Sequence, residues 1–189
     1  MRLNRETHLE LMQAWQIYFQ VRGNPDARDA LYRQIWDRYH KRILCFLRQR
    51  VPDEAEDLLQ DVMLRVFENL DRYKPTYSFS TWIFTIARNQ MINRMRKKRP
   101  PVSPVTESVP DSQQRSPEDR LIGEENRRMI ESLIQTLDPD QRQMVYLYYY
   151  EALRIRRIAQ IMDLPVGTVK SRLYWIRNQL RNKLGEINE

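Results

Sequence analysis

Residues 154–175 read RIRRIAQIMDLPVGTVKSRLYW, and their pattern indicates the architecture of the C-terminal part of the chain. Its apolar residues recur at helical spacing, the segment Asp163-Leu164-Pro165 interrupts them, and a second helical pattern begins at Val166. A helix, a short turn and a second helix predict a helix-turn-helix, in which the second helix reads DNA. A preceding helix is expected from Pro139, because Asp138 is a good N-cap and proline suits the first helical position.

The second helix of this pair has an apolar and a polar face. The apolar stripe must face the domain's own core, and it consists of Val169, Leu173, Ile176, Leu180 and Leu184. The opposite face is small and polar at its start, aromatic in the middle and basic at its edges, as a reader of the major groove requires. We predict that this face contacts duplex DNA, through Thr168, Lys170, Ser171, Arg172, Tyr174 and Trp175.

The chain divides at residues 100–119, which read PPVSPVTESVPDSQQRSPED. Five prolines exclude a helix there, since proline lacks the amide donor and clashes with the preceding turn. The segment is also acidic, whereas the chain on either side of it is basic. We therefore predict an all-α protein of two small helical domains, residues 1–99 and 120–189, joined by a flexible Pro/Ser-rich acidic linker.

Composition narrows the function. The 189 residues carry a net charge of +7, which favours a polyanionic partner. With one cysteine, Cys45, and two histidines, we expect no internal disulfide, no metal centre and no cofactor. No apolar stretch reaches the roughly 18 residues of a membrane span. Because the N-terminus also lacks the apolar core of a signal peptide, we expect a cytoplasmic protein without membrane insertion.

The N-terminal domain contains an acidic helix. Residues 53–61, DEAEDLLQD, hold five carboxylates, and the apolar spacing from Leu58 to Leu70 is typical of an amphipathic helix. The carboxylates of Asp53 and Glu54 are equally well explained as complements to the helix dipole. Those further along the helix fit a docking face for a basic partner.

An aromatic loop follows. Residues 73–82 read YKPTYSFSTW, and exposed aromatic rings beside positive charge suit stacking on unpaired bases. For Tyr77 and Phe79, base stacking and core packing stay open alternatives. Ser80 is the expected N-cap of the next helix, which reaches about Lys98.

One line along that helix is polar. It consists of Trp82, Asn89, Asn93 and Arg96, while most of the remaining residues are apolar. Asparagine is a poor helix former, but it offers a donor and an acceptor to a base edge. The basic end of the helix, residues 94–99, suits contact with phosphates.

These residues resemble a known family. The segments Glu54–Val62, Ser78–Ile83 and Ile86–Asn89 resemble region 2 of bacterial RNA polymerase sigma factors of the sigma-70 family, and Leu164–Leu173 resembles their region 4. With their surroundings, the two regions cover about residues 10–99 and 120–185. The chain lacks the long additional segments of primary sigma factors, so it resembles the small extracytoplasmic-function (ECF) group, whose members are alternative sigma factors.

The resemblance implies a role for each part. Region 2 would dock on the clamp helices of the largest subunit of core RNA polymerase, through Glu56, Asp57, Gln60, Asp61 and Arg65. It would also melt the minus-ten promoter element and bind its single strand, through Tyr73, Tyr77, Phe79, Trp82, Asn89, Asn93, Arg96 and Lys97. Region 4 would read the minus-thirty-five element as duplex. The linker would thread toward the active-site and RNA-exit channels, and an anti-sigma factor is an expected partner.

Two departures from the family pattern affect DNA preference. Residues 152–157 read ALRIRR, which makes the start of the helix-turn-helix unusually basic, and Trp175 stands where relatives often have a basic residue.

Other function classes fit less well. A stand-alone helix-turn-helix regulator has no need of a strand-melting module. A nucleic-acid-processing enzyme needs a nucleophile with a base, a phosphate-binding loop or a set of metal ligands. The carboxylates of residues 54–61 could mimic a metal site, but no His or Cys accompanies them. An anti-sigma or adaptor protein needs no DNA-facing residues.

Overall fold

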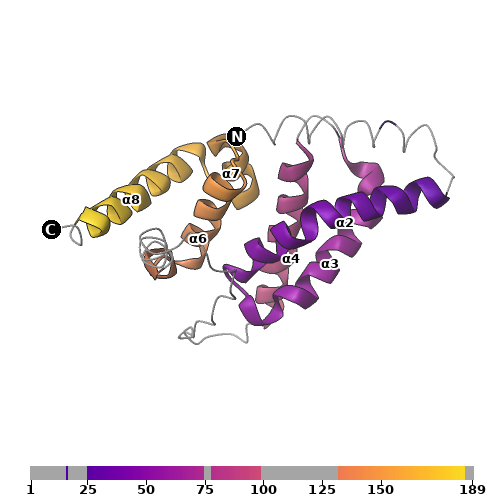
Figure 1. The fold of residues 1–189 in the computed structure, drawn as a ribbon, viewed down its shortest axis with the longest axis horizontal. Coiled ribbons are helices and arrows are strands. Elements are labelled where there is room, and N and C mark those ends of the chain that lie inside the picture. The colour runs from indigo at the N-terminus through magenta and orange to yellow at the C-terminus, as the bar shows by residue number, and fades with distance from the viewer. Residues whose placement is uncertain (1–15, 17–24, 75–77, 99–131, 186–189) are drawn as a thin grey trace, which may run out of the picture.

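The computed structural model describes residues 16, 25–74, 78–98 and 132–185, and every regular element in these ranges is helical (Figure 1). The all-α prediction is therefore confirmed for the described part of the chain. The predicted linker, residues 100–119, lies outside the described residues, as does Tyr77. None of the described helices combines the length and the apolar character that crossing a membrane requires.

Three helices form the N-terminal group: α2 (Pro25–Arg48), α3 (Ala55–Glu68) and α4 (Phe79–Lys98). The short turns η1 (Pro52–Glu54) and η2 (Leu70–Arg72) flank α3, and each long helix packs against the other two. The predicted periodicity of α3 is confirmed, because Leu58, Leu59, Val62 and Val66 are buried, whereas the charged residues of the helix face solvent. Rings from different helices meet inside, such as Phe46 and Phe84 at 5.3 Å edge to face.

The C-terminal group begins with α6 (Pro139–Val145), which continues as the π-helical turn η3 (Tyr146–Tyr150). The predicted N-cap is confirmed: the Asp138 carboxylate accepts the Gln141 N–H at 2.9 Å, and Gln141 caps the Asp138 N–H in return. The helix-turn-helix follows as α7 (Ile155–Met162) and α8 (Val166–Gly185). Asp163 ends α7 with φ of 52°, a left-handed conformation that turns the chain toward α8.

The start of α4 differs from the sequence prediction. Ser78, not Ser80, stands at the capping position, where its Oγ accepts the Thr81 N–H at 3.3 Å. Ser80 lies inside the helix and is buried, and its Oγ is 3.1 Å from the hydroxyl of Tyr39 on α2. The helix begins early because Phe79 is drawn into the core, which moves the capping position back to the residue before it.

The two helical groups touch. Helix α4 packs against α7, which in turn packs against α8, and one buried apolar cluster includes residues of both groups. Figure 1 shows the N-terminal helices on one side of this contact and the C-terminal helices on the other, with α8 pointing away. The contact therefore sets how the candidate binding faces lie relative to one another.

Candidate nucleic-acid interface

Helix α3 presents an acidic face to solvent. The five residues predicted for docking are all exposed on it: Glu56, Asp57, Gln60, Asp61 and Arg65. Leu58, Val62 and Val66 point into the core. Leu64 lies on the same outward face with 60% of its surface exposed. Leu64 was not predicted, because a leucine in an amphipathic pattern is more often a core residue. Its position one turn beyond Gln60 is the feature of the sequence that indicates this face.

The acidic face is partly paired within the chain. Arg48 of α2 donates to Glu56 at 2.9 Å, and Arg94 of α4 donates to Glu54 at 3.1 Å and to Asp61 at 3.0 Å. The hydrogen bond that Arg94 donates to Glu54 is the largest of several effects on the pKa of Arg94, and together they raise it. Arg94 therefore lies against α3 and separates from the basic residues further along α4. The Arg48–Glu56 and Arg94–Asp61 pairs are exposed, so water weakens them and a competing partner can replace them.

The aromatic residues predicted for base stacking form a cluster at the start of α4. Tyr73 and Phe79 are 5% and 4% exposed, and their ring centroids are 5.2 Å apart. Burial raises the pKa of Tyr73 to about 12. In this conformation both rings are core residues, which departs from the expectation of exposed stacking rings; Tyr39 on α2 also packs on Phe79 and holds it inward.

Trp82 lies at the edge of this aromatic cluster. Its ring centroid is 5.2 Å from that of Tyr73 and 5.3 Å from that of Phe79, and the side chain is half-buried. Among the described residues predicted to stack on bases, Trp82 is therefore the one whose ring is held in place by its neighbours and is also accessible to solvent. Tyr77 belongs to the predicted set but lies outside the described residues.

The polar residues of α4 lie on its outer surface. Asn89, Asn93, Arg96 and Lys97 are all exposed. The guanidinium of Arg96 donates to Asn93 Oδ1 at 3.2 Å, so the two side chains are held together. The opposite side of α4 is buried through Ile83, Phe84, Ala87 and Met91. The asparagine amides can hydrogen-bond to bases, and the two cations that follow them on the helix can contact phosphates.

Helix α8 separates its two faces as predicted. Val169, Leu173 and Ile176 are buried, and Leu180 packs against the small cluster around Ile176. The predicted DNA-facing residues Lys170, Ser171, Arg172, Tyr174 and Trp175 are exposed, and Thr168 is partly exposed. Ser171 Oγ donates to the Thr168 carbonyl at 3.0 Å, which keeps its hydroxyl close to the helix. Tyr174 and Trp175 stand out as large rings at the protein surface.

A basic hollow lies beside the helix-turn-helix. Its lining includes Arg154, Arg156 and Arg157 from the start of α7, Arg177 from α8, and the rings of Tyr148 and Tyr149. A hydrogen bond with Tyr149 contributes most to raising the pKa of Arg177. The unusual basic run at residues 154–157 is thus brought next to α8 and adds cations beside the exposed face of that helix.

The described residues contain no group of three or more His, Cys, Asp or Glu side chains that could hold a metal ion. The carboxylates of α3 are spread along an exposed helix, and several are paired with arginine. The described surface presents one acidic face, one asparagine-rich face with cations, and one basic and aromatic face.

Comparison with known protein families identifies both domains. Residues 35–100 match the family described as Sigma-70 region 2, and residues 127–180 match that described as Sigma-70, region 4. The ECF RNA polymerase sigma factor SigW of Bacillus subtilis (strain 168) is 31% identical over 95% of this chain and 100% of its own length. The ECF RNA polymerase sigma-E factor of Escherichia coli (strain K12) is 29% identical over 78% of this chain and 83% of its own.

Solved structures share the fold. The sigma factor RpoE from Bartonella quintana, solved with the anti-sigma factor NepR, aligns with a TM-score of 0.61 at 23% identity, over 82% of this chain and 96% of that one. CnrH, solved with the cytosolic domain of CnrY, aligns with a TM-score of 0.57 at 19% identity, over 95% and 97%. The resemblance found in the sequence is thereby confirmed: the chain belongs to the ECF group of the sigma-70 family and is an alternative sigma factor that directs transcription initiation.

Proposed function

We propose that this sigma factor uses three separate faces for three tasks: α3 to dock on core RNA polymerase, α4 to hold the melted minus-ten element, and α8 to read the minus-thirty-five element as duplex. The observation that carries the proposal is that each face is exposed and differs in chemistry from the others. We place the domain boundaries at residues 1–99 and 120–189, with residues 100–119 as the linker.

The polymerase partner of α3 is a basic or basic-edged surface, the clamp helices of the largest subunit. Charge and hydrogen bonds to it come from Glu56, Asp57, Gln60, Asp61 and Arg65. Leu64, one turn beyond Gln60, supplies an apolar contact. An exposed apolar side chain beside charged ones resembles the apolar centre and polar rim of a protein–protein interface.

The minus-ten contacts come from the outer surface of α4. Trp82 offers a ring for stacking, Asn89 and Asn93 offer donors and acceptors, and Arg96 and Lys97 offer charge to phosphates. Tyr73 and Phe79 support this surface from beneath by packing on Trp82. Tyr77 is included by resemblance to the family alone.

The minus-thirty-five contacts come from α8 and from the basic hollow beside it. Thr168, Lys170, Ser171 and Arg172 address the groove, and Tyr174 and Trp175 add apolar contact. Arg154, Arg156 and Arg157 extend the phosphate contacts. An anti-sigma factor is the proposed regulatory partner. We further propose that the chain works in the cytoplasm and is a regulatory subunit without catalytic activity of its own.

Run-off transcription tests this function. Purified core RNA polymerase is given genomic fragments with and without the full chain. Discrete transcripts that appear only with the chain support the proposal, and core alone is the control. If the chain binds promoter fragments but yields no promoter-dependent transcript with core polymerase, the assignment of tasks to the three faces is wrong.

A further inference from the structure

Four exposed residues lie together on the outer surface of α4: Asn89, Ile92, Asn93 and Arg96. They stand at positions i, i+3, i+4 and i+7, a spacing at which four side chains of one helix can surround a single group of a partner. At about 100° per residue they fall within an arc of about 100° on the helix. We call these four residues the α4 patch.

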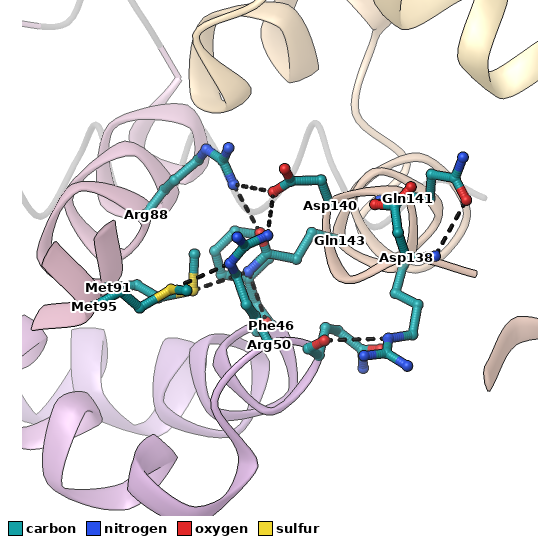
Figure 2. Close-up of polar contacts among 11 residues, drawn as sticks. Phe46, Arg50, Arg88, Met91, Met95, Asp138, Asp140, Gln141 and Gln143 are labelled. Carbon is teal, nitrogen blue, oxygen red and sulfur yellow. Dashed lines mark hydrogen bonds and ion pairs between the residues drawn. The ribbon is translucent and has the colours of Figure 1, made fainter. Parts of the chain in front are cut away.

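Other side chains of this part of α4 are used within the protein, as Figure 2 shows. Arg88 Nη1 donates to Gln143 Oε1 at 2.8 Å. The sulfur of Met91 accepts from Gln143 Nε2 at 3.3 Å, and that of Met95 accepts from Arg50 Nε at 3.2 Å. This stretch of the helix therefore offers the α4 patch, and not these three residues, to a nucleic acid.

Ile92 is the apolar member of the α4 patch. The side chain lies outside the buried clusters of the described residues, with 41% of its surface exposed. Isoleucine forms helices less readily than alanine, leucine or lysine, and a half-exposed side chain gains only part of the stabilisation that burial gives. Because its branched side chain is stiff at χ1, Ile92 presents methyl groups in a fixed direction beside its polar neighbours.

The contact between Arg96 and Asn93 determines which group this asparagine presents. A guanidinium carries donors and no acceptor, and Arg96 Nη2 donates to Asn93 Oδ1 at 3.2 Å. The amide oxygen is engaged in this way, so the hydrogens of Asn93 Nδ2 are the groups directed at a ligand. The α4 patch thus places a hydrogen-bond donor next to an aliphatic side chain.

Thymine is the base that matches this combination. It carries its O4 acceptor next to the 5-methyl group, so a donor and an apolar surface side by side complement its edge. Cytosine has an amino donor where thymine has O4, guanine has acceptors but no methyl group, and adenine has an acceptor beside an amino donor. A donor beside an isoleucine therefore satisfies thymine in two respects and every other base in at most one.

We propose that the α4 patch selects a thymine in the melted minus-ten strand: Asn93 Nδ2 donates to thymine O4, and Ile92 contacts the 5-methyl group. Arg96 is a positioning residue, since it holds the amide of Asn93. The inference rests on the proposed assignment of α4 to the minus-ten element, and it adds Ile92 to the residues that determine promoter specificity. An unpaired base can turn this edge toward a helix surface without the constraints of a duplex groove.

Base analogues test the methyl contact without any change to the protein. Holoenzyme made from core RNA polymerase and the full chain is titrated with promoter fragments mismatched across the minus-ten element, so that melting does not enter. Fragments with each base at each position first locate the position that prefers thymine. Deoxyuridine there lacks only the methyl group and should bind about fourfold more weakly, the ratio expected for one buried methyl group. Equal binding of thymine and deoxyuridine, or the lack of any position that prefers thymine, overturns the proposal.

Substitution of Ile92 ties the methyl effect to this residue. Ile92→Ala should abolish the difference between thymine and deoxyuridine, whereas Asn93→Ala should weaken binding of both bases and keep their ratio. Val166→Ala removes an exposed aliphatic side chain from α8 and is the matched control, which should keep the ratio of the parent chain. Thermal melts check that each variant is folded. A difference that persists in Ile92→Ala shows that another residue contacts the methyl group, and the proposal is then wrong.

A second pair of bases separates the methyl contact from the hydrogen bond. 5-methylcytosine keeps the methyl group but carries an amino donor in place of O4. At the same position it should therefore bind more tightly than cytosine and more weakly than thymine. If 5-methylcytosine binds as tightly as thymine, Asn93 does not donate to O4 and the proposed pairing of donor and methyl contact is refuted.

The same fragments distinguish this inference from the proposed function. Suppose that Asn89→Ala and Asn93→Ala change the base preference at minus-ten positions while thymine and deoxyuridine bind equally to the parent chain. The selection of thymine by Ile92 is then wrong, and the assignment of α4 to the minus-ten strand stands. If neither asparagine variant changes any base preference, the assignment of α4 is itself refuted.

Discussion

Arg94, near the end of α4, donates to Asp61 of α3 at 3.0 Å, and the same guanidinium holds Glu54 at 3.1 Å. This contact joins the helix proposed to bind the minus-ten strand to the helix proposed to bind polymerase. A change at Asp61 therefore alters the support of α4 as well as the charge of the docking face, and tests of docking must separate the two effects.

Reversing one charge at Asp57 tests polymerase docking. Asp57 is exposed in the first turn of α3. Asp57→Lys should weaken the affinity of the chain for core RNA polymerase, because it places a cation opposite a basic surface, and it should leave the fold intact. The measurement is a binding titration with labelled chain. Asp37→Lys on α2 is the matched control, and equal losses in the two variants would indicate a general charge effect.

Asp61→Lys is expected to weaken polymerase binding for two reasons, the lost carboxylate and the released Arg94. Arg94→Ala isolates the second reason, since it removes the link to α3 and keeps the acidic face. If Arg94→Ala alone reproduces the whole loss of Asp61→Lys, Asp61 supports α4 and does not contact polymerase.

Leu64 should contribute to polymerase binding and little to stability. Leu64→Ala removes an exposed side chain, so the free energy of unfolding should change by less than about 0.5 kcal/mol, whereas core binding should weaken by more than about 1 kcal/mol. Its neighbour Met63 is buried, and Met63→Ala should destabilise the domain by about 2–5 kcal/mol. Chemical denaturation and core titration of both variants give the comparison. Unchanged core affinity in Leu64→Ala would remove it from the docking face.

The asparagines of α4 should each affect one minus-ten position. Asn89→Ala and Asn93→Ala remove side chains from the outer surface of α4 and should weaken recognition by about 1–3 kcal/mol at the base each contacts. Asn93 also holds Arg96 at 3.2 Å, so its loss should add a smaller defect at every sequence. Transcription from a set of single-base minus-ten variants measures both. A loss of equal size on every variant would assign both asparagines a structural role.

Burial of Tyr73 predicts a stability loss in alkali. Its pKa rises from 10.0 to about 12 in the folded chain, chiefly because burial disfavours the phenolate. The folded state keeps the proton that the unfolded state releases, so this contribution is complete below pH 10 and is lost as the pH rises toward 12. Tyr73→Phe should therefore show a shallower fall of thermal stability over this interval.

Thermal melts at each pH and the phenolate absorbance near 295 nm check this expectation. The exposed Tyr174→Phe controls for the loss of one phenol. Wild-type and Tyr73→Phe chains with the same pH profile would show that Tyr73 ionises as readily in the folded state as in the unfolded state.

The sequence was sufficient to predict the helices and their faces, because burial follows the helical period at positions such as Val62 on α3 and Val169 on α8. It did not decide whether the aromatic residues near the start of α4 are exposed or buried. Phe79 is buried because Tyr39, forty residues earlier, lies against it, and local pattern holds no information on that distant contact. The same holds for the N-cap of α4, which follows the position of Phe79.

The polar contacts between the two helical groups were also beyond sequence reasoning. Arg88 reads as one of many basic residues on α4, yet it is 8% exposed because Gln143, 55 residues away, accepts from it. Polar residues such as Gln143 and Glu151 carry no periodic signal that separates a buried network from a solvated surface. Tertiary packing alone assigns them.

The two DNA-binding domains should respond differently to melted DNA. Trp82→Leu keeps an apolar side chain against Tyr73 and removes the ring available for stacking on unpaired bases, so it should slow promoter melting. Lys170→Ala and Arg172→Ala remove exposed cations from α8, so they should lower affinity for duplex minus-thirty-five DNA and reduce its dependence on salt.

A promoter that is already mismatched across the minus-ten element separates these effects. Its use should restore transcription by Trp82→Leu, because the energy of melting is no longer required, and should leave the Lys170→Ala and Arg172→Ala defects in place, because α8 reads duplex in both cases. The measurement is the ratio of transcripts from mismatched and paired promoters for each variant, with core polymerase at saturation. Rescue of both sets, or of neither, would contradict the assignment of melting to α4 and of duplex reading to α8.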